Sequence, residues 1–167
     1  MVVVDSSAII PLLNIGKLNL LINCFKGENI IIPEVVWNEV VKEGKLLGKI
    51  VSSLEENKSN FKLIYTKEKD ILKIEGLERT DLAVLSIAKS QKDVLLTNDA
   101  TMHKVALTQN IKTWWLTALI FYAVKRNIVS CDEGKDVLLE LVSTGTHLRS
   151  EIIAQALLIL EKLGRKQ

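Results

Sequence analysis

The sequence contains few cysteines, and their positions exclude two common frameworks. Cys24 and Cys131 lie far apart and form neither a CxxC pair nor the spacing of a zinc site. A structural zinc domain and a CxxC redox protein are therefore not indicated. Both residues are expected to be buried thiols in a reducing cytosol.

The sequence also lacks a long hydrophobic run. The segment WWLTALIFYAV is strongly apolar, but it has about half of the roughly 20 residues that a membrane-spanning helix needs. The N-terminus begins with valines rather than with the basic region of a targeting signal. We therefore expect a soluble cytoplasmic protein without a membrane partner.

Positive and negative charges are nearly balanced in the sequence. The net charge of +2 does not by itself indicate a nucleic-acid-binding protein, although it does not exclude one, because the distribution of charge matters more than the sum. Hydrophobic residues make up 48% and charged residues 25% of the chain, which is ordinary globular composition. With no internal repeat or linker, residues 1–167 are predicted to form one domain.

Short apolar segments alternate with segments of helical periodicity, which predicts an α/β fold with a parallel sheet. Four to five short strands are expected, at VVV (2–4), III (30–32), FKLIY (61–65), VLL (94–96) and NIKTWW (110–115). Helices are expected over 8–25, from Pro33 to about Lys42, over 46–57, and over 78–91 with Thr80 as N-cap. Three further helical stretches after about residue 116 predict an α-helical C-terminal extension.

Two aspartates follow predicted strands. Asp5 comes directly after Val2–Val4, and Asp99 comes soon after Val94–Leu96. Ligands of open α/β sheets bind at the carboxyl ends of the strands. A buried carboxylate without a partner is costly, so water or a positive group is expected beside Asp5.

Two further acids lie on predicted helices. Glu39 has apolar neighbours along its helix, and Asp81 shares a helix face with Leu85 and Ala88. Each acid also has an ordinary explanation when taken alone. Asp81 is suited to the positive end of its helix dipole, Asp99 to a turn or a helix cap, and Glu39 to the exposed edge of an amphipathic helix.

The four acids together favour a metal site. If they converge, their charges repel and raise one another's pKa values, and a divalent cation would relieve this. Ligands that are all oxygen suit Mg²⁺ or Mn²⁺ rather than Zn²⁺. The sequence therefore predicts that a metal neutralises Asp5 at the end of its strand.

The stretches VVVDSSAII, IIPEVVWNEV, ERTDLAVLSIAK and LLTNDATMHKVA resemble the motifs of the PIN-domain nucleases, which include the VapC-type toxins of toxin–antitoxin pairs. Asp5 followed by Ser6, Glu39, Asp81 and Asp99 match the family's four acids in order. The resemblance covers about residues 1–115, and the tail is similar to a branch of PIN-like proteins with C-terminal helices. It implies a three-layer α/β/α fold with a central parallel sheet.

The resemblance implies a metal-dependent endoribonuclease that acts on single-stranded RNA. Asp5, Asp81 and Asp99 would bind Mg²⁺ or Mn²⁺, and Glu39 would hold a second ion or orient the attacking water. Glu78, three residues before Asp81, is an alternative ligand, but Asp81 is preferred because it shares a helix face with Leu85 and Ala88. The implied partners are a small antitoxin and a second copy of the chain in a homodimer.

Four supporting residues complete the predicted site: Ser6 and Asn98 would orient the carboxylates, and Arg79 and Lys104 would contact phosphate.

An alternative is a catalytically silent PIN-like scaffold or RNA-binding module. A scaffold would fold equally well with Asp5 and Asp99 changed to asparagine, and Mn²⁺ would not stabilise it. His103 is expected to be a surface residue without a catalytic role. Trp114 and Trp115 are expected in the core or at a partner interface rather than in base stacking.

Overall fold

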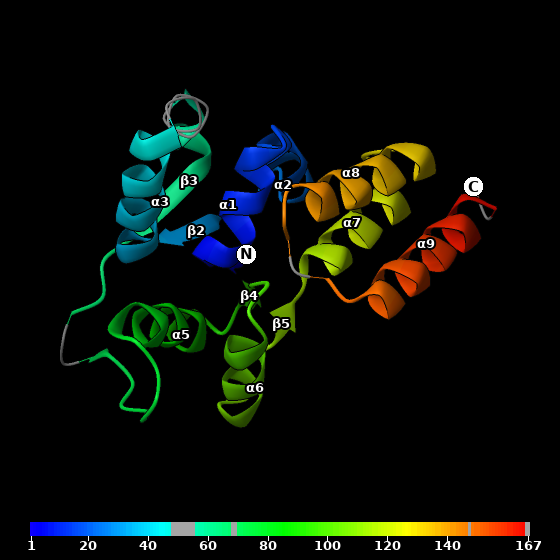
Figure 1. Cartoon of the computed structure of the whole chain (residues 1–167). Helices are drawn as coiled ribbons and strands as arrows, with labels where there is room; N and C mark the ends of the chain where they lie inside the picture. The colour runs from blue at the N-terminus through cyan, green and yellow to red at the C-terminus, as the bar shows by residue number, and fades with distance from the viewer. Residues whose placement is uncertain (48–55, 68–69, 147, 166–167) are drawn as a thin grey trace.

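The computed structural model describes residues 1–47, 56–67, 70–146 and 148–165 of the chain (Figure 1). The elements are β1 (Val2–Val4), α1 (Ser6–Asn14), α2 (Leu18–Cys24), β2 (Ile30–Pro33), α3 (Glu34–Leu47), the 3₁₀ turn η1 (Lys58–Asn60), β3 (Phe61–Ile64), α5 (Arg79–Gln91), β4 (Val94–Leu96), α6 (Ala100–Thr108), β5 (Thr113–Trp114), α7 (Leu116–Lys125), α8 (Cys131–Ser143) and α9 (Ser150–Gly164).

The five strands form one parallel sheet in the order β3-β2-β1-β4-β5. Figure 1 shows α3 and α5 on one side of the strands and α1, α2 and the C-terminal helices on the other. The predicted α/β class and the parallel sheet of four to five short strands are confirmed. Because β1 is central and buried on both faces, its three valines need no polar alternation.

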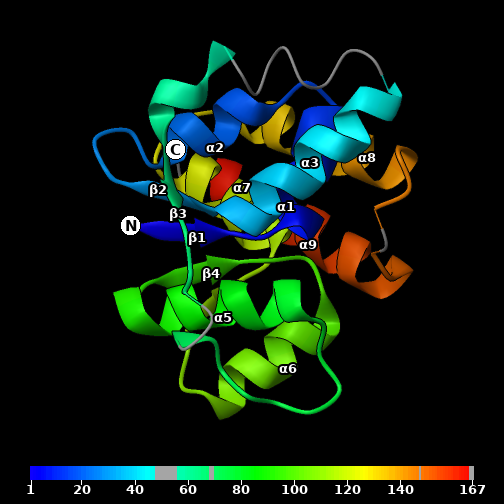
Figure 2. The ribbon, with the colours of Figure 1, turned by 90° about the vertical axis from the view of Figure 1, so that its left-hand side faces the viewer.

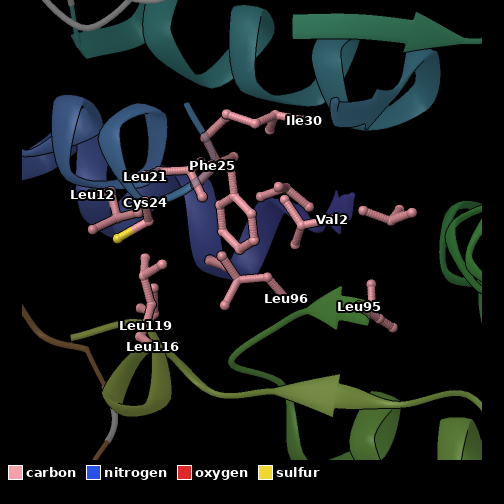
Figure 3. Close-up of a cluster of buried hydrophobic side chains, with 14 of the residues drawn as sticks. Val2, Leu12, Leu21, Cys24, Phe25, Ile30, Leu95, Leu96, Leu116 and Leu119 are labelled. Carbon is pink, nitrogen blue, oxygen red and sulfur yellow. The ribbon is translucent and has the colours of Figure 1, made fainter. Parts of the chain in front are cut away.

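The hydrophobic core includes residues of helices on both faces of the sheet, and on one face it fills the space between the strands and the helices that follow β1 and β5. Leu12, Leu21 and Phe25 pack between the strands and the buried leucines of α7 (Figure 3). Burying each such side chain stabilises the fold by about 1.5–3 kcal/mol. This packing fixes α7 against α2 and β5, and so ties the tail to the sheet.

Helix boundaries differ from the prediction where backbone geometry overrides the local pattern. The helix predicted over 8–25 is two helices, since Gly16 with a φ of +67° ends α1 and lets the chain turn into α2. The N-cap of α5 is Glu78 and not Thr80, because Asp81 lies in the first turn, where the backbone of Glu78 hydrogen-bonds its side chain. Pro33 ends β2, where it pairs with Ile64, and α3 begins one residue later.

Two other predicted helices differ in extent from the helices of the structure or cannot be compared with them. The one predicted to end near Lys42 continues to Leu47. The one predicted over 46–57 lies mostly outside the described residues.

The tail consists of three helices that pack on one another. One apolar stripe of α9 faces the other two helices, with Ala156 and Leu160 buried and Ile153, Leu157 and Leu163 half-buried. Gly134 of α8 lies so close to α7 that a β-carbon there would stand 2.7 Å from a methyl group of Val124. Within the parts of the chain described above, no helix has the length and apolarity required to cross a membrane.

Candidate active site

Asp5 lies at the carboxyl end of the central strand and is only 4% exposed. Its backbone N–H donates to the carbonyl of Leu96 at 3.0 Å, which continues the pairing of β1 with β4. Its carboxylate accepts hydrogen bonds from Ser7 Oγ at 2.6 Å and Thr97 Oγ1 at 2.8 Å. Hydrogen bonds to a charged acceptor are strong, so these two hydroxyls make the buried charge tolerable.

The same two hydroxyls connect the ends of the neighbouring strands. Ser7 Oγ and Thr97 Oγ1 lie 3.0 Å apart. Ser7 Oγ also accepts from the backbone N–H of Asn98 at 2.9 Å, and Thr97 Oγ1 accepts from that of Asp99 at 3.2 Å. The loop that carries Asn98 and Asp99 is thereby held next to Asp5.

The serine predicted to orient Asp5 is not its nearest hydroxyl. Ser6 Oγ stands 3.5 Å from Asp5 Oδ1, at the outer limit of a hydrogen bond. Ser7 and Thr97, neither of which is among the predicted site residues, are the close donors. Thr97 was identifiable only by the register of β1 against β4, in which Val4 pairs with Leu96.

Asp99 is the N-cap of α6 and accepts a hydrogen bond from the backbone N–H of Met102 at 2.7 Å. Asp99 therefore has the helix-cap role that was expected of it as an ordinary structural residue. The residue is exposed, so its carboxylate is also open to solvent beside the end of β4. A capping role and a ligand role are compatible, because a carboxylate has several lone pairs.

Asp81 lies in the first turn of α5, a helix that packs on β1, β2 and β4. Burial raises the pKa of Asp81, and the negative charges of Asp5 and Asp99 raise it further. A hydrogen bond from the backbone of Glu78 acts in the opposite direction. The structure therefore brings three of the predicted acids into one electrostatic neighbourhood, while Glu78 itself is exposed.

Glu39 is half-buried on α3, between the buried Val36 and Val40. This helix packs against α1, which begins just after Asp5, and against α5, which carries Asp81. Glu39 therefore lies on the helix that borders both other parts of the site.

The predicted supporting residues occupy three different settings. Asn98 is half-buried, and its side-chain Oδ1 is buried without a hydrogen-bond partner among the described residues. Arg79, the first residue of α5, is exposed and stands two positions before Asp81. Lys104 is exposed on α6.

The donor chemistry of this edge fits a hard divalent cation. The charges of Asp5 and Asp99 both raise the pKa of Asp81, and the Oδ1 of Asn98, which has no hydrogen-bond partner among the described residues, adds an uncharged oxygen. Over the described ranges, no three His, Cys, Asp or Glu side chains are grouped closely enough to hold a metal by themselves. Mg²⁺ usually retains several waters and binds through one or two carboxylates, so it does not require such a group.

His103 is not the surface residue that was expected. One ring nitrogen, Nδ1, lies 2.8 Å from Thr113 Oγ1, and the other, Nε2, lies 3.0 Å from the carbonyl oxygen of Thr97. Its ring stacks on Trp115 with 3.6 Å between centroids. Burial lowers the pKa of His103. The imidazole thus connects α6 to the residues at β4 and β5, and these contacts explain why His103 is partly buried.

The comparisons with known proteins agree with this architecture. A family model described as "DUF3368: PIN domain" matches residues 1–162. The chain therefore belongs to the PIN domain family, whose members are generally nucleases and generally depend on divalent metals. No match was found among curated proteins.

Two solved structures are similar to this chain. One is a PilT N-terminus domain protein, SSO1118, from the archaeon Sulfolobus solfataricus P2, with a TM-score of 0.55 and 15% identity over 71% of this chain and 88% of that chain. The other is a domain of a functionally unknown protein from Methanocaldococcus jannaschii, with a TM-score of 0.47 and 23% identity over 69% of this chain and 89% of that chain. At this identity, the first similarity shows the PIN-like fold alone.

Proposed function

We propose that the chain is a divalent-metal-dependent endoribonuclease that cleaves single-stranded RNA in the cytoplasm. The observation that supports this most directly is the electrostatic effect of Asp5 and Asp99 on Asp81, since the three acids come from separate parts of the chain. The pKa of Asp81 is raised by burial and then by the charges of the other two acids. Such repulsion costs stability, and perturbed acids of this kind are concentrated at functional sites.

Each residue of the edge has a role in this proposal. When bound, Mg²⁺ or Mn²⁺ would make water a nucleophile at neutral pH and stabilise charge on the phosphate. Asp5, Asp81 and Asp99 would hold the ion directly or through bound water, while Glu39 would hold a second ion or orient the attacking water. Ser7 and Thr97 fix the orientation of the Asp5 carboxylate.

The RNA backbone needs positive groups beside these acids, because phosphates are attracted to Lys and Arg side chains. Arg79 is suited to this by its place two residues before Asp81. Lys104 stands on the helix that Asp99 caps. Asn98, with its unpartnered Oδ1, would complete the polar lining next to Asp5.

The test is cleavage of end-labelled single-stranded RNA with Mn²⁺, with Mg²⁺ and with EDTA. Wild type should cleave only with metal, and Asp5→Asn should lose the activity. Asp132→Asn is the control, since Asp132 is an exposed acid in the first turn of α8, in the tail. Equal cleavage by wild type and Asp5→Asn would indicate a contaminating nuclease or a different site.

A second measurement separates the nuclease from the silent scaffold. A ligand that binds only the folded chain stabilises it, by about 2.7 kcal/mol at a hundred times its Kd. Mn²⁺ should therefore raise the Tm of wild type and raise that of Asp5→Asn much less. A wild-type protein that neither cleaves RNA nor gains stability from Mn²⁺ would support the scaffold instead.

We also propose that the chain forms a homodimer and that, as the toxin of a toxin–antitoxin pair, it binds a small antitoxin. Ile152, Leu158 and Ile159 of α9 are apolar and exposed, which supports a protein contact along the tail. Light scattering should give a dimer mass, and a monomer at high concentration would contradict the homodimer. A protein encoded by an adjacent short reading frame should co-purify with the chain and suppress its cleavage of RNA.

A further inference from the structure

A cavity of about 500 Å³ adjoins the candidate active site. Its volume lies within the range of about 300–1,000 Å³ that is usual for ligand pockets. One part of its wall comes from the loop that carries the acid at the end of β4, and the rest comes from the tail. The lining residues are Asn98, Asp99, Ala100, Trp115, Thr117, Leu148, Arg149 and Ile152.

The shape of the fold explains why this cavity exists. Trp115 immediately follows β5, and α9 begins close to the loop after β4, at the same edge of the sheet (Figure 2). The tail thereby contributes Leu148, Arg149 and Ile152 to a surface that begins at Asp99. The tail is thus part of the surroundings of the acids as well as of the hydrophobic core.

Trp115 has the properties of a stacking platform. One face of its indole lies against His103, whose two ring nitrogens are both hydrogen-bonded, so the indole is held in place. Its side chain is nevertheless 37% exposed and borders the cavity. Every nucleobase has a flat π-face, and stacking on such an aromatic ring is a sequence-tolerant mode of single-strand binding.

Arg149 supplies the positive charge on the same cavity. It is the N-cap residue of α9, it is exposed, and among the described residues it has no ion-pair partner. A guanidinium group binds phosphate through two parallel hydrogen bonds. The hydroxyl of Thr117, also in the lining, adds a group that can donate and accept.

We propose that this cavity binds one nucleotide of single-stranded RNA beside the phosphodiester at the acids, with its base stacked on Trp115 and its phosphate held by Arg149. The inference rests on the proposed nuclease function and adds a binding subsite to it. A nucleotide fits the combination of a fixed exposed indole, a cation and an adjoining carboxylate edge. Trp115 would then stack on a base, whereas the sequence favoured a place in the core or at a partner interface.

The experiment measures binding separately from cleavage. Fluorescence anisotropy with a labelled single-stranded RNA octamer, in EDTA at low salt, gives the Kd of the full chain without hydrolysis. Trp115→Leu and Arg149→Ala should each weaken binding about tenfold or more, whereas Trp115→Phe should retain most of it. Arg126→Ala is the matched control for Arg149→Ala, because Arg126 is exposed at the far end of α7 and stands over Tyr122.

Abasic substitution in the RNA separates stacking from a merely structural effect. Removing one base at the position that occupies the cavity should weaken binding to wild type and should leave binding to Trp115→Leu unchanged. Melting temperatures of all variants show whether they remain folded, and Trp115→Phe serves as the folded stacking variant. A structural role for Trp115 would not produce this dependence on a single base.

The outcomes distinguish this inference from the proposed function. If wild type binds RNA and both Trp115→Leu and Arg149→Ala bind equally well, the nucleotide subsite is wrong, and a protein segment becomes the better occupant. If wild type does not bind RNA in EDTA, the subsite is also wrong. In either case the metal-dependent cleavage assay still decides separately whether the chain is a nuclease.

Discussion

Asp5 and Thr97 stand side by side at the ends of the neighbouring strands β1 and β4, and Thr97 Oγ1 donates a hydrogen bond of 2.8 Å to the Asp5 carboxylate. The parallel register of β1 and β4 creates this pair, because the preceding residues, Val4 and Leu96, are Cα partners. Thr97 is fully buried, so its hydroxyl has little access to water. The strand pairing that stabilises the sheet therefore also orients Asp5, the most buried acid of the candidate site.

Removing this hydroxyl should impair both stability and activity. Thr97→Val keeps the shape but leaves the buried Asp5 carboxylate with one close donor fewer, which should cost about 1–3 kcal/mol of unfolding free energy. Metal affinity or metal-dependent cleavage should fall about 10–100-fold, as is typical when a residue that orients a ligand is lost. Urea unfolding and Mn²⁺ titration measure the two effects. Thr97→Ser retains the hydroxyl and should be close to wild type, and a Thr97→Val protein with unchanged metal affinity would contradict the argument.

The two serines after Asp5 should differ in their effects although they are adjacent. Ser7 Oγ lies 2.6 Å from the carboxylate, and Ser6 Oγ lies 3.5 Å from it. Ser7→Ala should therefore lower metal affinity by about tenfold or more, and it also removes the acceptor of the Asn98 N–H. Ser6→Ala is the natural control and should change metal affinity little. The opposite order of effects would mean that the arrangement of the hydroxyls changes when the metal binds.

Neutralising an acid of the site should stabilise the metal-free protein. Asp81→Asn removes a charge that repels Asp5 and Asp99, and changes of this type commonly add about 0.5–2 kcal/mol. Asp99→Asn should act in the same direction, because asparagine also caps α6, whereas Asp99→Ala loses the cap bond to Met102. Thermal unfolding in EDTA measures this, and excess Mn²⁺ should remove the advantage of both asparagine variants.

The pH dependence of this stabilisation has a defined sign. Because the pKa of Asp81 is higher in the folded chain than its ordinary 3.8, the folded state binds that proton more tightly. The contribution of Asp81 to stability is therefore complete below pH 3.8 and is lost as the pH rises through the raised pKa. The difference in unfolding free energy between Asp81→Asn and wild type should accordingly increase from acid to neutral pH. A constant difference would indicate that charge repulsion is not its cause.

The sheet was predictable from the sequence, and the contacts within the site were not. Val2–Val4 and Val94–Leu96 are continuous apolar runs, and such runs form buried parallel strands wherever the chain alternates with helices. The order of the four acids along the chain predicts the candidate site, and the structure shows that the charges of Asp5 and Asp99 act on Asp81. The role of Thr97, however, depends on which strands are neighbours, and β1 and β4 are distant in sequence.

Local rules failed where several candidates compete. Threonine is the better N-cap by preference, yet α5 begins after Glu78, where Asp81 takes the first-turn position and accepts from the Glu78 backbone. The cavity beside Asp99 was hidden for another reason. Arg149 reaches it only because the tail folds back across the edge of the sheet, and no local pattern around residue 149 indicates that placement.

The two thiols should react at very different rates in the folded protein. Cys24 is buried among the side chains that join α2 to α7 (Figure 3), and burial raises its pKa to about 12. Because the thiolate is the reactive form, Cys24 should resist iodoacetamide at neutral pH. Cys131 is only half-buried, although its thiol donates to the carbonyl of Leu160, and it should be modified first.

Mass spectrometry of timed digests checks the order of modification. In denaturant both thiols should react at similar rates, which serves as the control for intrinsic reactivity. In native buffer, modification of Cys24 requires opening of the core between α2 and α7, so its rate should fall whenever the protein is stabilised. Mn²⁺ should therefore slow the modification of Cys24 if it binds at the acids. Fast modification of Cys24 in the native protein would show that α7 does not stay packed on α2.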